Sequence, residues 1–202
     1  RQVMDQRFTS SLSEGSLSAL KYAKNLTDVP VSFFPFVFGI ALFPFLADMA
    51  AAGDRERLRA MLMSATRMMV LIFVPLTIFV IMLREPIVTA LFSSKSLLTT
   101  QPLLFYAIGM LIGALEIIVL QFYFAMSDTL RPTIVGMVMV PLHILFAYVA
   151  IYHWQIGILG IALALLFSKG TKVTILYAMI RKKLGMLEGQ RTLMLIGQVA
   201  LS

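Results

Sequence analysis

The chain contains no cysteine among its 202 residues, and charged residues make up only 13% of it. The missing cysteine excludes disulfides and thiolate metal sites, although it does not identify a cellular compartment. A soluble domain carries roughly a quarter of its residues as charged side chains. Here 59% of the residues are hydrophobic, and the mean hydropathy is +0.90. We therefore predict an integral membrane protein.

Motifs of enzymes and cofactor sites are also missing. The sequence has no G-x-S-x-G, no H-E-x-x-H, no P-loop and no glycine-rich phosphate fingerprint. The two histidines, His143 and His153, would lie about 15 Å apart along a helix, which argues against a shared catalytic site. We therefore predict no enzyme, cofactor or metal. The net charge of +7 does not indicate nucleic acid, because the basic residues cluster between apolar runs.

Five apolar runs have the composition of membrane-spanning helices. They cover residues 29–47, 68–83, 103–126, 133–154 and 156–180, and the first span is expected to start near residue 16. Residues 1–12 fit the end of a preceding helix, and residues 192–202 fit the start of a following one. No signal peptide is visible, and the first residue is not Met. We predict an all-α, polytopic helix bundle in which residues 1–202 form one transmembrane domain of a larger protein.

Successive connections of the predicted bundle alternate between many and few basic residues, so one side of the membrane is rich in them and the other is poor. Residues 48–67 are expected to form a connection with a surface helix that carries four arginines, and residues 181–183 add a further basic cluster. The connection 93–102 carries one basic residue. Because lysine and arginine are enriched in cytoplasmic loops, we expect residues 48–67 to be cytoplasmic and residues 93–102 to be periplasmic.

The first apolar run is interrupted by Pro30, Pro35 and Pro44. Each proline removes a backbone donor and kinks a helix, so we expect Pro30 and Pro35 to mark a hinge. Just before this run, Lys24 and Asp28 are four residues apart and share a helix face. Such a charged face is either the wall of a polar cavity or simply the solvated end of the helix, and the sequence leaves both readings open.

Three further charges lie inside apolar runs. Glu116 is in the third run, and Lys169 and Lys172 are in the fifth. Each would cost about 2.5–3.5 kcal/mol at the centre of a membrane helix, so each should face protein or water. The lysines are too far from the end of their run to reach the cytoplasm, since about 20 Å of helix separates Lys169 from Lys182. We expect the lysines to line a cavity and Glu116 to be either a structural acid or a coupling acid.

Two further patterns are typical of packing. His143 is a single histidine on an apolar helix and is expected to belong to the core. Gly109 and Gly113 form a G-x-x-x-G pattern, which indicates close helix packing.

The order of several segments is similar to one transporter family. The stretches EGSLSALKYAKNLTDVP and GIALFPFLADMAAAGD resemble the start of the second half of MurJ-type (MviN) lipid II flippases. REPIVTALF and FAMSDTLRPT follow in the order that this family has, the latter with Tyr123 and Phe124 as an aromatic pair. The similarity covers roughly residues 5–185. It implies a fragment of a two-lobed transporter, from the end of the seventh helix to the start of the thirteenth.

This resemblance implies a function in peptidoglycan synthesis. The family moves undecaprenyl-diphosphate-linked precursor from the cytoplasmic to the periplasmic leaflet of the bacterial inner membrane by alternating access. Its partners would be this lipid, membrane lipids and cell-wall synthesis proteins, with no nucleic acid. The family's headgroup site in this region maps onto Lys24, Asn25 and Asp28, but the family's arginine is absent and Lys24 stands one position earlier. We expect these three residues, with Lys169 and Lys172, to bind the headgroup and diphosphate.

The sequence also departs from the family in one loop. The family's R-G-x-F-t segment is replaced by SSKSLLTT. A flippase for lipid-linked polysaccharide repeats, or a cation-coupled drug exporter of the same superfamily, therefore remains an alternative. A drug exporter would need an acidic, aromatic cavity, for which Glu116 is the one clear midspan acid.

Overall fold

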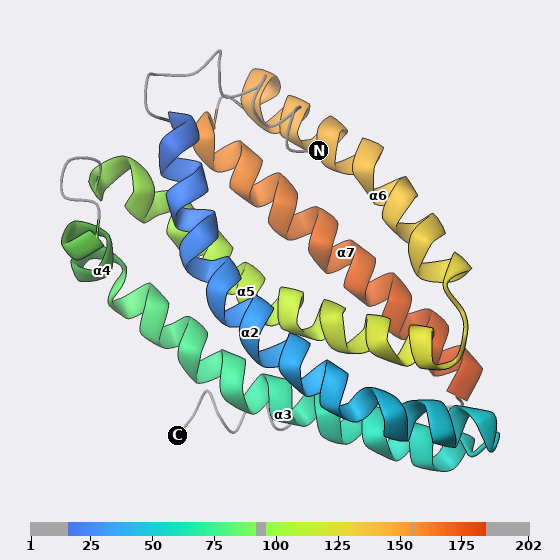
Figure 1. The fold of residues 1–202 in the computed structure, drawn as a ribbon. Helices are drawn as coiled ribbons and strands as arrows, with labels where there is room; N and C mark the ends of the chain where they lie inside the picture. Colours follow the sequence, from blue (N-terminus) through green and yellow to red (C-terminus); the bar gives the residue numbers. More distant parts are fainter. Residues whose placement is uncertain (1–15, 92–95, 155, 185–202) are drawn as a thin grey trace.

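A computed structural model describes residues 16–91, 96–154 and 156–184. This part of the chain is helical throughout and contains no strand (Figure 1). The elements are α2 (Ser16–Ala51), α3 (Arg55–Met82), α4 (Arg84–Leu91), α5 (Ser96–Ala125), α6 (Leu130–Tyr148), the π-helix η1 (Val149–His153) and α7 (Ile158–Leu184). Five of them are long and apolar enough to cross a membrane, as the sequence predicted. The expected partial helices at 1–12 and 192–202 lie outside the described residues.

The second span begins earlier than the sequence suggested. Residues 48–67 do not form a connection with a separate surface helix, because α2 continues to Ala51 and α3 already begins at Arg55. A side-chain oxygen of Asp54 accepts a hydrogen bond from the backbone N–H of Arg57 at 3.0 Å and caps α3. Gly53 has a φ of +68°, a conformation in which a side chain would be strained. This short turn lets the arginines form the first turns of α3 itself.

Helix α2 remains continuous through its three prolines. It changes direction along its length rather than breaking (Figure 1). Pro35 is buried and Pro44 is exposed. The kinks that the sequence predicted are therefore bends within one helix of 36 residues.

Helix α5 is the centre of the bundle. Helices α2, α3, α4 and α7 all pack against it, and α6 packs on the outer side of α7. Buried positions on α5 include Leu103, Ala107, Met110 and Ala114, which follow helical spacing. In lipid the hydrophobic effect does little to hold helices together, so packing and polar contacts carry more of the association. One such contact is the hydrogen bond that the Tyr123 hydroxyl donates to the Leu176 carbonyl at 3.0 Å.

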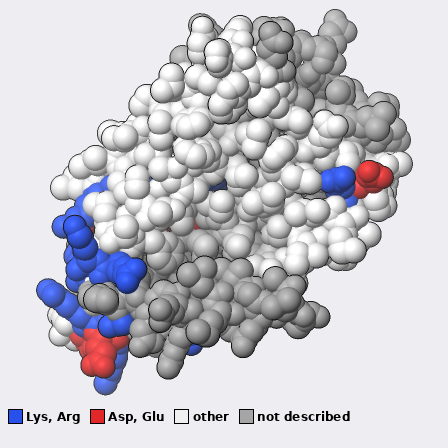
Figure 2. Space-filling model, turned by 180° about the vertical axis from the view of Figure 1, so that it is seen from behind, with Lys and Arg blue, Asp and Glu red and all other residues white. Residues whose placement is uncertain are grey.

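Basic side chains gather at one end of the molecule (Figure 2). At this end α2, α3, α5 and α7 meet around a hollow that Arg55, Ser127 and Lys183 help to line. Asp128, in the turn after α5, accepts a hydrogen bond from Lys183 at 2.8 Å and pairs with Arg131 at 3.2 Å. Burial raises the pKa of Asp128, but the hydrogen bond and the two positive charges outweigh it and lower the pKa below 3.8. The carboxylate is thus ionised at neutral pH and clamps α7 to the turn.

We predict that this basic end faces the cytoplasm, because it holds most of the basic residues at the helix ends. Cysteine labelling would test the topology in a full-length protein from which other cysteines have been removed. Ala52 is a better position than the neighbouring Gly53, whose positive φ disfavours any side chain. Ala90, exposed in α4, represents the opposite end, since Ser94 lies outside the described residues. We expect an impermeant reagent added to intact cells to label Ala90→Cys and not Ala52→Cys; the reverse pattern would invert the topology.

Candidate functional site

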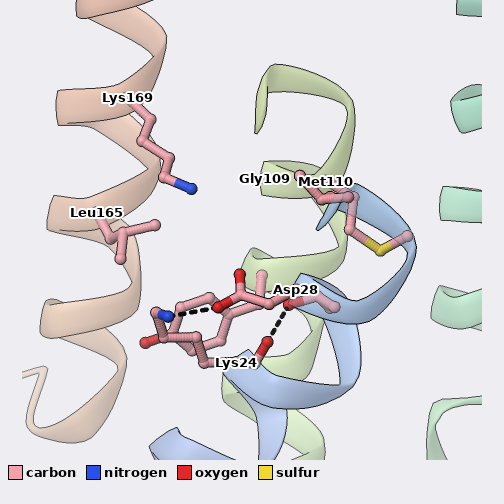
Figure 3. Close-up of a pocket in the computed structure, with 9 residues that line it drawn as sticks. Lys24, Asp28, Gly109, Met110, Leu165 and Lys169 are labelled. Carbon is pink, nitrogen blue, oxygen red and sulfur yellow. Dashed lines mark hydrogen bonds and ion pairs between the residues drawn. The ribbon is translucent and has the colours of Figure 1, made fainter. Parts of the chain in front are cut away.

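A narrow cleft opens between α2, α5 and α7 (Figure 3). It is lined by Lys24, Thr27, Asp28 and Val31 of α2, Tyr106, Gly109 and Met110 of α5, and Leu165 and Lys169 of α7. Two of the predicted lysines, Lys24 and Lys169, therefore come together from helices far apart in the sequence. With Asp28, the described lining carries two positive charges and one negative charge, so the cleft has a net positive charge that attracts anions.

Lys24 is held by its own helix. Its ammonium group forms an ion pair with the Asp28 carboxylate, and the side chains of Lys24 and Asp28 are 37% and 41% exposed. The two residues share a helix face, as their spacing predicted. The Thr27 hydroxyl between them donates to the Lys24 carbonyl at 2.9 Å, so it is occupied within α2. The polar groups of α2 in the cleft are thus the two ends of one solvent-accessible ion pair.

Lys169 reaches the cleft along the glycine face of α5. A Cβ atom added to Gly113 would lie 3.8 Å from the Lys169 ammonium nitrogen and 3.1 Å from a methyl group of Val31. A Cβ atom added to Gly109 would lie 3.8 Å from Leu166 of α7, which is an ordinary van der Waals contact. The G-x-x-x-G pattern therefore permits close packing at Gly113, against Val31 of α2, and the Lys169 ammonium lies next to this glycine.

Lys172 does not line this cleft. Its ammonium donates to the Glu116 carboxylate at 2.6 Å, and the two side chains are only 20% and 16% exposed. A Cβ atom on Gly136 of α6 would lie 3.9 Å from the ammonium, so the side chain runs between α5 and α6. The structure therefore places Lys169 in this cleft and Lys172 outside it. Lys169 lies near Gly113 of α5, whereas Lys172 is paired with Glu116 of α5 and lies near Gly136 of α6.

The remaining predicted residues fall elsewhere. Asn25 lies outside the cleft, in a shallow hollow on the outer face of α2 with Val29 and Phe33. His143 is fully buried, as expected of a core residue, whereas His153 is exposed. Among the residues that the structure describes, no three His, Asp or Glu side chains gather where they could hold a metal ion.

Sequence reasoning missed the part of the cleft that α5 provides. Tyr106 and Met110 are uncharged residues on an apolar helix, and nothing in the pattern sets them apart from ordinary core positions. Only the packing of α2 and α7 on α5 identifies them as lining residues.

Comparison with known proteins decides the family. A family model described as lipid II flippase MurJ matches residues 1–202. The chain belongs to the MurJ family. It is 25% identical over 181 residues to a probable lipid II flippase MurJ of Bdellovibrio bacteriovorus, covering 87% of this chain and 34% of that protein. A probable lipid II flippase MurJ of Borreliella burgdorferi is 25% identical over 172 residues, which cover 82% of this chain and 34% of that protein.

A solved structure shows the same fold. The lipid II flippase MurJ in an inward closed conformation superposes with a TM-score of 0.79 at 22% identity, over 96% of this chain and 41% of that one. The chain thus spans about a third of the length of the curated relatives. Membership in the MurJ family, the helical transporter fold and a multi-pass location in the bacterial inner membrane are confirmed.

Proposed function

We propose that the protein to which this chain belongs moves lipid II from the cytoplasmic to the periplasmic leaflet by alternating access. One observation carries this proposal beyond the family membership: Lys24 and Lys169, from two different helices, face one cleft in a membrane-spanning bundle. The cleft is proposed to hold the diphosphate of the lipid, with Lys24 and Lys169 as its cations. Cell-wall synthesis enzymes that consume the flipped lipid are the protein partners that this function implies.

The physical reason is the cost of moving a diphosphate out of water. A diphosphate concentrates negative charge, and burying an uncompensated charge in a low-dielectric medium is very unfavourable. An ammonium group about 4 Å from a phosphate oxygen gains about 1 kcal/mol in water but about 4 kcal/mol at an effective dielectric constant near 20. Two ammonium groups in a cleft inside the bundle therefore offset the desolvation far better than the same groups would at an open surface.

Complementation tests the proposal. In cells depleted of their own lipid II flippase, we expect expression of the full-length protein to restore growth and the appearance of lipid II in the outer leaflet. A protein that is abundant in the membrane but restores neither would contradict the proposal. The same cells supplied with a polysaccharide-repeat flippase serve as the negative control.

The alternative of a drug exporter gains no support from the position of Glu116. An exporter of cationic drugs needs an acid that a cation can reach, and the Glu116 carboxylate is already paired with Lys172. A membrane-embedded transferase, a function of a different class, would need a cluster of histidine and carboxylate groups. His143 is buried in α6 and His153 is exposed in η1, so the two do not form such a cluster.

We predict that the Pro35 bend takes part in switching between inward-open and outward-open states. Pro35 is buried within α2, a few residues beyond the cleft, and removing it would restore a backbone donor and stiffen the bend. Pro35→Ala should leave membrane abundance unchanged and slow flipping by about tenfold, an expectation based on the slow closing motions that limit many such cycles. Pro44→Ala, at an exposed proline of the same helix, is the matched control. Equal flipping rates for both variants and the parent would show that the bend serves only helix packing and has no role in switching.

A further inference from the structure

The position of Asp28 differs from that of an ordinary ligand-binding residue. It lines the cleft with Lys24 and Lys169, and it also lines the shallow hollow on the outer face of α2 with Asn25, Ser32 and others. Its side chain is 41% exposed. The carboxylate therefore lies at the rim where the cleft meets the outer face, and its negative charge is directed at the same ammonium group that an entering anion would use.

The charges of the cleft are poorly matched to tight anion binding in this state. Two ammonium groups, those of Lys24 and Lys169, and one carboxylate, that of Asp28, are the charged groups among its described lining residues. Asp28 neutralises Lys24 through their ion pair. A diphosphate would have to displace this carboxylate and then remain next to its negative charge, which opposes binding.

We infer that Asp28 is an internal competitor of the lipid diphosphate, one that holds Lys24 while the cleft is empty and weakens binding so that the lipid can leave. This inference rests on the proposed function and assigns Asp28 a role opposite to that of a headgroup ligand. A transport site must bind its cargo firmly enough to load it and weakly enough to release it. Because affinity differences among variants of one site lie mostly in the dissociation rate, a built-in competitor would act mainly by speeding release.

A purely structural role for Asp28 makes a different prediction. An ion pair between residues four apart on a helix stabilises that helix slightly and leaves the affinity for an anion unaffected. Asp28→Asn keeps the shape of the side chain and removes only its charge, so it separates the two roles. Asp48→Asn is the matched control, because it removes one negative charge from the same helix at an exposed position about 30 Å away.

The test uses full-length protein in detergent, titrated with farnesyl diphosphate, with farnesyl monophosphate as the comparison ligand. We expect Asp28→Asn to bind farnesyl diphosphate about fivefold more tightly than the parent, the effect of a partly exposed charge pair. The increase in affinity caused by Asp28→Asn should be smaller for farnesyl monophosphate, and Asp48→Asn should not increase the affinity for either ligand. In vesicles, lipid II flipping at saturating lipid should be slower in Asp28→Asn, because release is slower.

Each outcome decides a different point. Unchanged or weaker diphosphate binding by Asp28→Asn, while the parent binds normally, overturns the role of Asp28 and leaves the proposed function intact. A parent that shows no preference for the diphosphate over the monophosphate contradicts the proposed diphosphate site, and the inference falls with it. Should Asp28→Asn fail to accumulate, Asp28→Ser gives the same comparison without the amide.

Discussion

Replacing Lys24 with glutamate is expected to abolish flipping while the protein remains at normal abundance in the membrane. The change turns an attraction for the diphosphate into a repulsion within one cleft, and each unit charge at about 4 Å is worth about 4 kcal/mol at an effective dielectric constant near 20. Since every 1.4 kcal/mol corresponds to a factor of ten, only part of this change in interaction energy would lower the flipping rate more than about a hundredfold. Abundance should hold, because two like charges four residues apart destabilise a helix by only about 0.5 kcal/mol.

Two companion variants make this result specific. Lys24→Arg keeps the positive charge and adds bidentate geometry toward phosphate, so it should retain flipping. Lys21→Glu reverses a charge at an exposed position one turn earlier in α2, outside the cleft, and should flip normally. Lys169→Ala removes the second cation of the cleft and should also lose flipping at normal abundance. Normal flipping by both Lys24→Glu and Lys169→Ala would refute the diphosphate site.

The sequence was sufficient to predict the membrane spans, because long apolar runs separated by charged turns have few other stable forms. It placed the start of the second span wrongly because the arginines of residues 55–67 look like a surface helix. A helix of 28 residues is longer than the bilayer core, so its first turns can carry arginines outside the membrane without a break. The position where apolar composition begins is therefore not the position where the helix begins.

The charges on α7 show a second limit of sequence reasoning. Residues three apart differ by about 60° around a helix, which is close enough to count as one face. In this bundle α5 lies against that face, and the small angle directs Lys169 toward α2 and Lys172 toward α6. The division depends on which helix packs on which, and no local spacing contains that information.

The ion pair between Glu116 and Lys172 is expected to be structural, so neutralising either residue alone should lower the stability of the protein. Both side chains are mostly buried between helices, at 16% and 20% exposed. Removing one partner of a buried pair leaves the other charge uncompensated, which typically costs about 3–5 kcal/mol. We therefore expect Lys172→Met and Glu116→Gln each to lower the thermal stability and the membrane abundance of the full-length protein.

The double variant Glu116→Gln/Lys172→Met separates a structural acid from a coupling acid. Since replacing a whole buried pair by uncharged groups of similar volume is often neutral, we expect the double variant to recover most of the stability lost in each single variant. With Lys24, Asp28 and Lys169 untouched, it should also flip lipid II at close to the parental rate. A double variant that is stable and abundant but does not flip would show that the Glu116 charge is used in the transport cycle itself. Thermal unfolding and vesicle flipping, measured on the four proteins of this cycle, distinguish the two outcomes because stability and transport would then change independently.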